Sequence, residues 1–403
     1  MKKLFLITQF YPFEKNEESF ILPELKRLKN VFNVTVIAAD VSLDAEIKAK
    51  IPSDVKVVRY DPNSVRLARL INKNIGIRLS KVCKAAKANG EYNKHYYVKG
   101  MTFERWFRKN HFVDKDEEFV IYSYWFLWWN LGFAEHREKY PNMKLITRAH
   151  GFDLYDERHR DGGQPFRKYL DSRIDKVLFV SKMGMNYYLE RQANQPVQYE
   201  KYVVSYLGQE DFCGDSFAKK DNDSFTIVSC SNVIPLKRVE LIADALATVK
   251  SDMPIRWVHF GDGSSMESLN MAANKALSAN GNLTIELKGR VDNLEVLDFY
   301  KKDEADLFIT TSSTEGLPVS ISEAMSFGLP IIATDVGGIK EQVEGNGILL
   351  SPNPLASEVA GAIERIMHMD SATRDKMGKI SRKIWKKKFD ISVNIKEFIK
   401  AIN

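Results

Sequence analysis

Short apolar segments alternate with helical patterns along this chain, and they do so in two successive series. Strands spaced by helices are typical of parallel sheets whose strands are joined by crossover helices. The first series comprises 3–8, 33–39, 55–60, 119–122, 144–148 and 176–179, and the second comprises 225–229, 255–260, 283–287, 306–310, 330–334 and 347–350. A length of 403 residues is enough for two domains. The predicted fold class is therefore α/β, with two doubly wound Rossmann-like domains in series.

The boundary between the two series is a polar stretch at 208–224, which lacks apolar periodicity and is predicted to be a linker. A helical pattern with a basic surface follows the second series at 372–402 and includes Lys386, Lys387 and Lys388. In doubly wound domains, ligands bind at the carboxyl ends of the strands. Two such domains in series predict a ligand cleft between them.

The composition, with 44% hydrophobic and 28% charged residues, is ordinary for a soluble globular protein. No apolar run reaches the roughly 20 residues that span a membrane. The apolar segment at 3–8 is better explained as a first strand than as a signal peptide. The three cysteines, Cys83, Cys213 and Cys230, have neither metal-ligand nor disulfide spacing. These features predict a protein of the cytoplasm.

Basic residues are concentrated between Arg66 and Lys109, where twelve lysines and arginines accompany only two acids, and aromatic residues are interleaved with them. One interpretation is a peripheral membrane contact, in which this segment meets anionic lipid or a lipid-diphosphate acceptor at the inner face of the membrane. The alternatives are a solvated helical face and a nucleic-acid surface. We expect no nucleic-acid partner.

A phosphate-binding pattern occupies 310–328, where a polar loop follows the apolar segment 306–309 and leads into a helix. Pro318 suits the first position of this helix, and Gly328 suits the position just past its end. The free amides of a helix start form an anion site. Glu315 and Glu323 bracket this site, and carboxylates accept hydrogen bonds from sugar hydroxyls. The pattern therefore predicts a ligand that combines phosphate with sugar, such as a nucleotide-sugar.

The two glutamates also carry a resemblance to a known family. Seven residues separate them in EGLPVSISEA, and Gly-Leu-Pro follows the first. This E-x7-E arrangement resembles the retaining glycosyltransferases of family 4, of the bacterial surface-polysaccharide type, which have the GT-B fold. The resemblance implies an acceptor-side domain at 1–208, a nucleotide-sugar-binding domain at 209–385, and a C-terminal helix at 386–403 that returns to the first domain.

The resemblance assigns roles to the residues of this motif. Glu315 would bind the hydroxyls of the transferred sugar as part of the catalytic site, and Glu323 would hold the ribose of the nucleotide. The sugar and the distal phosphate would be bound by the backbone amides of Gly316, Leu317, Val319 and Ser320. Taken alone, each glutamate also fits a solvated acid near a helix start.

Cations are expected from two further loops. Lys237 follows the segment 225–229 at a helix start, where it can neutralise a diphosphate as a point charge. An exposed lysine in a first helical turn is the alternative. The family has an arginine five residues before this lysine, and Asn232 stands in its place here. Arg290, which follows the segment 283–287, is the predicted substitute, and an ordinary loop arginine is its alternative.

His150 is the candidate from the first domain. It follows the segment 144–148 and precedes a glycine, so we expect it at the carboxyl end of a parallel strand. The resemblance implies that this histidine contacts the transferred sugar near its anomeric centre. A loop histidine, or one that is already hydrogen-bonded, is the alternative.

Two further stretches of the first domain have less specific patterns. The first loop is acidic, with Glu14, Glu17 and Glu18, and we expect it to face the hydroxyls of the acceptor. An aromatic run at 122–129 fits either a platform for the acceptor or a strand end and helix in the core, and the core interpretation is favoured.

The sequence therefore predicts a retaining, hexosyltransferase-like glycosyltransferase that uses a UDP- or GDP-sugar as donor and a glycan or a lipid-linked glycan as acceptor. No cofactor and no metal are expected, because the acidic triplets at 114–116 and 221–223 do not follow strands at a cleft. The alternatives are a non-catalytic subunit that binds nucleotide-sugars, and a sugar-nucleotide epimerase or hydrolase on the same fold.

Overall fold

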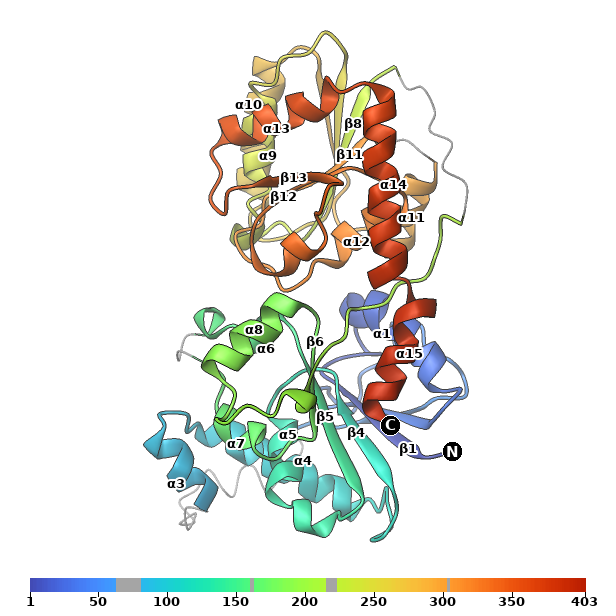
Figure 1. The fold of residues 1–403 in the computed structure, drawn as a ribbon, viewed down its shortest axis with the longest axis vertical. Coiled ribbons are helices and arrows are strands. Elements are labelled where there is room, and N and C mark those ends of the chain that lie inside the picture. The colour runs from blue at the N-terminus through green and yellow to red at the C-terminus, as the bar shows by residue number, and fades with distance from the viewer. Residues whose placement is uncertain (63–80, 160–162, 215–222, 303–304) are drawn as a thin grey trace. The chain divides into compact units, whose positions relative to one another are not determined.

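The structure of this chain is a computed structural model, which describes residues 1–62, 81–159, 163–214, 223–302 and 305–403. These residues form two compact units (Figure 1). The first unit is Met1–Gly208 with Asn394–Asn403, and the second is Gln209–Val393. Each unit contains one parallel sheet. The α/β architecture with two Rossmann-like domains, predicted from the alternation of strands and helices, is confirmed.

The sheet of the first unit has seven strands in the order β3-β2-β1-β4-β5-β6-β7. The strands are β1 (Lys3–Thr8), β2 (Asn33–Ala38), β3 (Lys56–Arg59), β4 (Phe119–Ser123), β5 (Met143–Ala149), β6 (Lys176–Phe179) and β7 (Tyr202–Val204). The first six were predicted from their apolar residues. The edge strand β7 was not, because three residues are too few to form a pattern. The strand order reverses between β1 and β4, so the loops that follow these strands meet at the switch point.

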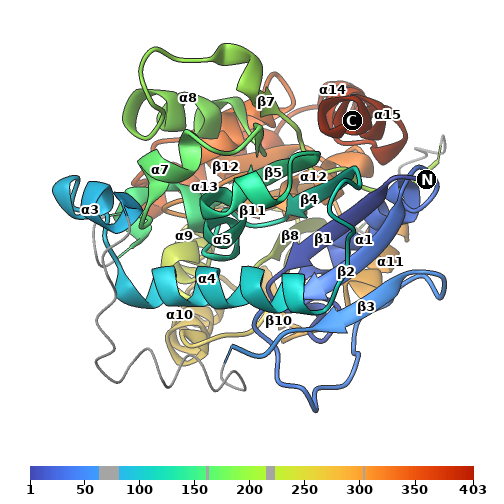
Figure 2. The same cartoon turned by 90° about the horizontal axis from the view of Figure 1, so that it is seen from below.

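Helices cover both faces of this sheet (Figure 2). They are α1 (Glu18–Leu28), α3 (Lys81–Ala88), α4 (Lys94–Lys109), α5 (Trp129–Glu135), α6 (Gly151–Leu154), α7 (Arg167–Asp171) and α8 (Lys182–Arg191). The aromatic residues Tyr96, Phe103 and Phe107 of α4 are buried in the core of the unit. The ring of Phe107 lies 4.9 Å from that of Phe5 in β1. In the described part of the basic segment, these aromatic side chains are therefore accounted for by packing. Residues 63–80 of that segment lie outside the described residues.

The opposite face of the same sheet contains a buried ion pair. Arg148 in β5 donates two hydrogen bonds to the carboxylate of Glu24 in α1, at 2.8 and 3.2 Å, and a third to Ser205 Oγ at 3.0 Å. The ring of Phe398, in α15 (Ile391–Ile402), lies 4.9 Å from the guanidinium. The C-terminal part of α15 thus packs within the first unit, which includes residues 394–403.

The sheet of the second unit has six strands in the order β10-β9-β8-β11-β12-β13. The strands are β8 (Phe225–Cys230), β9 (Ile255–Phe260), β10 (Leu283–Leu287), β11 (Leu307–Thr310), β12 (Ile331–Thr334) and β13 (Gly347–Leu350). All six were predicted, with ends that differ by one residue at most. The order again reverses at the centre, between β8 and β11, so the loops after these two strands are neighbours.

The helices of the second unit are α9 (Glu240–Leu246), α10 (Met266–Ala279), α11 (Asn293–Lys301), α12 (Val319–Ser326), α13 (Ala356–Met367) and α14 (Ser371–Lys388). The pattern at 372–402 contains two helices rather than one. The break between α14 and α15 has a physical cause, because Phe389 C=O and Ile391 N–H both bond to the backbone of Gln209.

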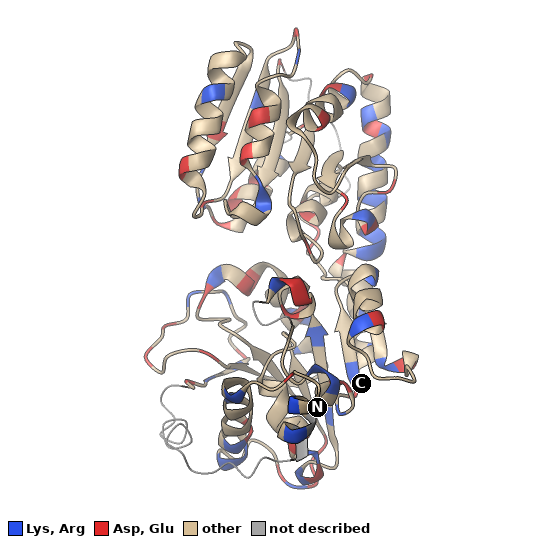
Figure 3. Cartoon of the chain, turned by 90° about the vertical axis from the view of Figure 1, so that its left-hand side faces the viewer, with Lys and Arg blue, Asp and Glu red and all other residues tan. Residues whose placement is uncertain are grey.

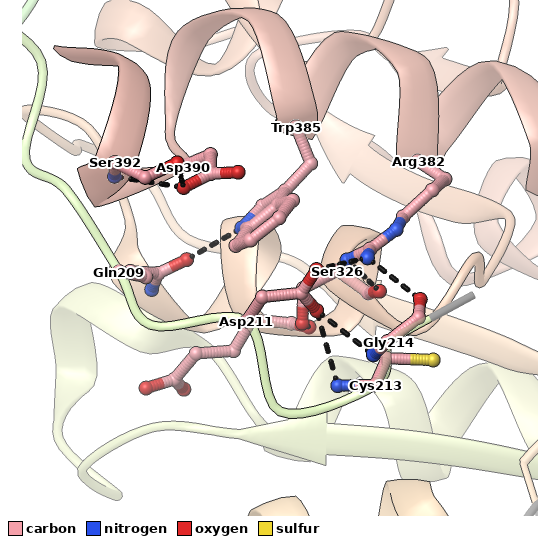
Figure 4. A network of polar contacts seen from close by, with 10 residues as sticks. Gln209, Asp211, Cys213, Gly214, Ser326, Arg382, Trp385, Asp390 and Ser392 are labelled. Carbon is pink, nitrogen blue, oxygen red and sulfur yellow. Dashed lines mark hydrogen bonds and ion pairs between the residues drawn. The ribbon is translucent and has the colours of Figure 1, made fainter. Parts of the chain in front are cut away.

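Residues 209–214, which were predicted as linker, are held against α14 (Figure 4). Trp385 donates its indole N–H to Gln209 Oε1 at 3.0 Å. Arg382 forms an ion pair with Asp211 and also donates to the carbonyl oxygen of Gly214 at 2.8 Å. The beginning of the second unit is therefore fixed to its last long helix. Residues 215–222 lie outside the described residues.

The exposed face of α14 is basic (Figure 3). Its exposed lysines recur at helical spacing and are Lys376, Lys379, Lys383, Lys386 and Lys387. The opposite face, with Trp385, is buried. The lysine run near the end of the helix is thus a solvated helical face. Within the described ranges, no helix is both long and apolar enough to cross a membrane.

Candidate functional site

The loops after β8, β9 and β10 are bonded to one another at the carboxyl edge of the second sheet. Val233 N–H donates to the carbonyl oxygen of Asp262 at 2.9 Å, and Gly261 N–H donates to that of Gly289 at 2.8 Å. A Cβ on Gly261 would lie 1.8 Å from the carbonyl oxygen of Ser231. Only glycine allows this approach, so the Gly-Asp-Gly turn at 261–263 serves to bring the three loops together.

The loops after β11 and β12 are bonded in the same way. Gly338 N–H donates to the carbonyl oxygen of Gly316 at 2.8 Å, and Gln342 Nε2 donates to that of Pro318 at 3.0 Å. A Cβ on Gly337, whose φ is +54°, would lie 1.9 Å from the carbonyl oxygen of Glu315. The backbone that carries Glu315 is therefore supported by the loop after β12.

We expect Gly337→Ala to destabilise the second unit by more than the ~1–2 kcal/mol that a left-handed alanine costs, because the new methyl group also collides with the backbone at Glu315. Gly361→Ala is the matched control. It lies in α13, its Cβ would meet nothing within 4 Å, and it should gain roughly 0.5–1 kcal/mol in the helix. Urea unfolding curves of both variants test this. A Gly337→Ala variant as stable as the parent would contradict the steric account.

Helix α12 begins one residue later than predicted. Pro318 has an extended ψ of 123° and is the residue before the helix, and Val319 is its first helical residue. Because the first amides of a helix have no partner within it, Val319, Ser320 and their neighbours can bind an anion. The anion site stays a prediction, and proline stands outside the helix rather than in its first turn.

Lys237 and Glu315 are brought together although 78 positions separate them. The Lys237 ammonium donates to Glu315 Oε1, and both side chains are largely buried. Lys237 is the last residue of a 3-10 turn, Pro235–Lys237, which precedes α9. The prediction had placed it at the start of the helix itself. The pair places one cation and one carboxylate directly beside the start of α12.

Glu323 lies in the second turn of α12 and is buried, with 8% of the residue exposed. Burial raises the pKa of its carboxyl group to about 7, although Asn293 Nδ2 donates a hydrogen bond to Oε1 at 2.8 Å. Burial also raises the pKa of the Cys230 thiol to about 12, with the charge of Glu323 adding to the effect. A buried carboxyl with a single amide partner retains the capacity to accept hydrogen bonds from a ligand.

Asn232 and Arg290 are both exposed, on loops that are bonded to the turn at 261–263. Asn232 lies between Ser231, which bonds to the end of β9, and Val233, which bonds to Asp262. Arg290 follows Gly289, the acceptor of the Gly261 N–H. Lys237 is held instead by the loop after β11, since Ser313 N–H donates to the carbonyl oxygen of Leu236 at 2.8 Å.

His150, in the first unit, immediately follows β5 and precedes α6. Its ring lies 4.3 Å from the Trp125 ring and 5.2 Å from the Tyr124 ring, and only 8% of the residue is exposed. Burial and the charge of Arg148 hold the imidazole pKa well below its usual range, so the ring is neutral. Neither ring nitrogen has a hydrogen-bond partner among the described residues. A neutral, unpartnered imidazole can both donate to and accept from a ligand hydroxyl.

One of the three acids of the first loop, Glu17, does not face the acceptor as predicted. The Glu17 carboxylate accepts the N–H groups of Phe10 and Tyr11, at 3.1 and 2.8 Å, and the indole N–H of Trp125. Glu17 is therefore a structural carboxylate that fixes Trp125, whose ring in turn contacts that of His150. The sequence offered no sign of this link, because 108 positions separate Glu17 from Trp125. The rest of the aromatic run at 122–129 is mostly buried, as the core interpretation predicted.

Two further residues of the second unit were missed. Arg238 bonds to the loop after β11, which carries Glu315, and Asn293 bonds to Glu323 in α12. For metal ligands, the described part of the chain contains no group of three or more His, Cys, Asp or Glu side chains that could hold an ion. The acidic triplet at 221–223 falls largely outside the described residues.

Residues 215–384 match the model of a family described as glycosyl transferases group 1. Among curated proteins, the chain is 28% identical over 220 residues to the uncharacterized glycosyltransferase MJ1178 of Methanocaldococcus jannaschii, covering 53% of this chain and 57% of that protein. It is 39% identical over 115 residues to the O-antigen biosynthesis glycosyltransferase WbnH of Escherichia coli, covering 28% and 30%. The chain thus spans about half or less of the length of these relatives.

Two solved structures share the whole fold. The apo form of the lipopolysaccharide outer core galactosyltransferase WaaB has a TM-score of 0.68 at 16% identity, with 100% of this chain and 99% of that one covered. The Anabaena protein HepE, in complex with UDP, has a TM-score of 0.64 at 17% identity, with 99% of each chain covered. The fold is therefore GT-B.

The group 1 match contains all of the candidate residues in the second unit. The loops after β8, β10 and β11, with Lys237, Arg290 and Glu315, lie inside residues 215–384, as does Glu323 in α12. His150 lies outside it. The likeness to the family is thus carried by the half of the chain that holds the phosphate-binding pattern.

Proposed function

We propose that this protein is a retaining glycosyltransferase that moves a hexosyl group from a nucleotide-diphospho-sugar to a glycan or a lipid-linked glycan. The observation that supports this most is the Lys237–Glu315 pair beside the start of α12, with the buried Glu323 one turn further along that helix. A cation, free helix amides and two carboxylates in one place match the phosphates and the hydroxyls of such a donor. The match to the group 1 family supports the same reaction class.

In this proposal, the donor occupies the carboxyl edge of the second sheet. Glu323 accepts hydrogen bonds from the ribose hydroxyls, and Glu315 accepts them from the sugar that is transferred. The diphosphate lies against Lys237 and the start of α12, and the amides that serve it and the sugar are those of Gly316, Leu317, Val319 and Ser320. Asn232 and Arg290 contact the donor from the loops at the 261–263 turn, where Arg290 supplies the second positive charge.

Lys237 would act when the bond between the sugar and the diphosphate breaks. Negative charge then builds up on the leaving phosphate, and a fixed ammonium stabilises it. Without donor, Glu315 neutralises this ammonium. Once the Glu315 carboxylate accepts hydrogen bonds from the sugar hydroxyls, the Lys237 ammonium becomes available to the phosphate. No metal ion has a part in this scheme, since lysine and the helix amides supply the positive potential.

His150 is proposed to contact the transferred sugar. Because its imidazole is neutral and neither ring nitrogen has a described partner, it can hydrogen-bond a sugar hydroxyl without adding a positive charge near the anomeric centre. Trp125 and Tyr124 fix the plane of the ring. Glu17 contributes through Trp125 rather than by contact with substrate.

The acceptor is proposed to be an intermediate of a bacterial surface polysaccharide, in keeping with the relative WbnH, an O-antigen biosynthesis glycosyltransferase. The donor base is proposed to be uracil or guanine, and the UDP complex of HepE favours uracil. A lipid-linked acceptor would place the protein on the cytoplasmic side of a membrane. Contact there would use the lysines and arginines of 66–109, because the described aromatic residues Tyr96, Phe103 and Phe107 are committed to the core.

Donor binding should depend on the ionisation of Glu323. Its pKa of about 7 means that the carboxylate needed to accept ribose hydroxyls forms only as the pH rises through neutrality. We expect the affinity for UDP-glucose, whose diphosphate does not titrate in this range, to increase about tenfold between about pH 6 and pH 8. Isothermal titration calorimetry measures this. Glu323→Gln should bind more weakly and without the pH dependence, and an equally steep profile in that variant would contradict the assignment.

The same raised pKa affects the stability of the protein without ligand. Protonated Glu323 is favoured in the folded state, so its contribution is complete below the unfolded pKa and is lost as the pH rises through about 7. Glu323→Gln should therefore raise the melting temperature more at pH 8 than at pH 5. This readout is independent of any substrate.

A binding screen tests the proposed function. Thermal shifts are measured with UDP-, GDP- and ADP-sugars, and each complex is then assayed for release of the nucleoside diphosphate with and without a bacterial lipid extract as acceptor. The proposal expects one base to stabilise the protein and release to depend on the acceptor. Release without acceptor would favour a hydrolase, and binding without release would favour a non-catalytic subunit.

A further inference from the structure

Arg238 has a backbone conformation that L-residues rarely adopt. Its φ and ψ are 48° and 41°, in the left-handed region. A residue with a Cβ pays roughly 1–2 kcal/mol there, and glycine does not. An arginine at this position therefore needs a side-chain interaction that offsets the strain.

The guanidinium of Arg238 supplies that interaction by joining two other loops. Nε donates to the carbonyl oxygen of Thr311 at 2.7 Å, and Nη2 donates to that of Ser312 at 3.0 Å. Nη2 also donates to the carbonyl oxygen of Pro352 at 2.8 Å, and Nη1 donates to Asn353 Oδ1 at 3.1 Å. One side chain thus connects the loop after β8 with those after β11 and β13.

The loop after β11 holds Arg238 in return. Thr311 Oγ1 donates to the carbonyl oxygen of Arg238 at 2.8 Å, and Ser313 N–H donates to that of Leu236 at 2.8 Å. Lys237 lies between these two contacts, and Glu315 lies on the same loop as their partners. Both ends of the Lys237–Glu315 pair are therefore fixed by the backbone that Arg238 connects.

We propose that Arg238 is a positioning residue for donor turnover: its guanidinium fixes the loops after β8, β11 and β13 so that the Lys237 ammonium stands at the distance from Glu315 and the start of α12 that the leaving diphosphate requires. This inference rests on the proposed function. Arg238 does not touch the donor in this scheme, because its Nε, Nη1 and Nη2 groups donate to backbone and amide oxygens. A lysine could not replace it, since one ammonium cannot span acceptors on two loops.

The test compares Arg238→Gly and Arg238→Lys with the parent protein. Glycine relieves the backbone strain and removes the guanidinium, so a purely conformational role predicts no loss of turnover. The positioning role predicts that kcat falls by about ten- to a hundredfold in both variants, as expected when a catalytic group is misplaced by about 1 Å, while the donor KM changes far less. Circular dichroism confirms that each variant is folded.

Chemical rescue provides the second readout. Guanidinium chloride at low millimolar concentration should restore part of kcat in Arg238→Gly, and sodium chloride at the same concentration should not. Parent-like kcat in Arg238→Gly, or a loss that guanidinium does not reverse in a folded variant, overturns the inference. A parent protein that releases no nucleoside diphosphate from any donor would instead refute the proposed function itself, so the two failures are distinct.

Discussion

Lys237→Ala is expected to reduce kcat/KM for donor turnover by about two to three orders of magnitude, the effect of removing one preorganised group that stabilises developing charge. The physical reason is the position of the ammonium, which is held beside the start of α12 by its ion pair with Glu315. Most of the loss should appear in kcat, because the charge on the leaving phosphate is greatest in the transition state. Release of nucleoside diphosphate in a coupled assay measures it.

The control for this variant is Lys275→Ala, on the exposed surface of α10, which removes the same charge from a place without a proposed role. Lys237→Arg should retain part of the activity, since the charge is kept but the geometry changes. The double variant Lys237→Ala with Glu315→Gln should have nearly the same kcat/KM as the less active of the two single variants, because the two groups act as a unit. If kcat/KM of Lys237→Ala is within a factor of about five of the parent value, Lys237 has no part in the mechanism.

Arg148→Met is expected to lower the stability of the first unit by about 3–5 kcal/mol, the cost of leaving one member of a buried ion pair without its partner. Glu24 would keep its carboxylate in a site that is only 6% exposed, and Ser205 would also lose its bond to the guanidinium. The loss should appear in urea unfolding followed by tryptophan fluorescence, since Trp106, Trp125, Trp128 and Trp129 all lie in this unit.

Two comparisons make this prediction specific. Arg191→Met changes an exposed arginine at the end of α8, whose guanidinium lies 5.0 Å from the Tyr187 ring, and should shift stability by less than ~0.5 kcal/mol. Arg148→Met together with Glu24→Leu removes both charges and should recover most of the loss, because no unpaired charge remains. If the double variant is less stable than Arg148→Met alone, the unpaired charge of Glu24 is not the cause of the lost stability.

The fold could be predicted from the sequence wherever a strand is long and apolar on both faces. Strands such as β8 and β9 are runs of this kind, since both faces of a parallel sheet are covered by helices. The three residues of β7 were missed because so short an edge strand has no pattern. The end of α14 was missed for another reason: bonds to Gln209, some 180 positions earlier in the chain, interrupt the helix there.

The candidate site shows the same division between local and distant effects. Glu315, Glu323 and Lys237 could be named from their sequence context, and the loops after neighbouring strands bring the first and the last together. Arg238 could not, because LKRVEL reads as an ordinary helix start and the left-handed turn depends on acceptors near 311 and 352. Glu17 was assigned to the acceptor because the sequence does not reveal that the amides of Phe10 and Tyr11 fold back onto it.

In the proposed function, the second unit binds a nucleotide-diphospho-sugar and the protein transfers its sugar. The most direct measurement uses the donor that the binding screen selects, with a carbon-14 label in its sugar, and a bacterial lipid-linked glycan extract as acceptor. We expect label to move into the glycan fraction, one nucleoside diphosphate to be released for each sugar moved, and Lys237→Ala to slow both by about two to three orders of magnitude. Label that stays in the bound donor, or that appears only as free sugar, would contradict it.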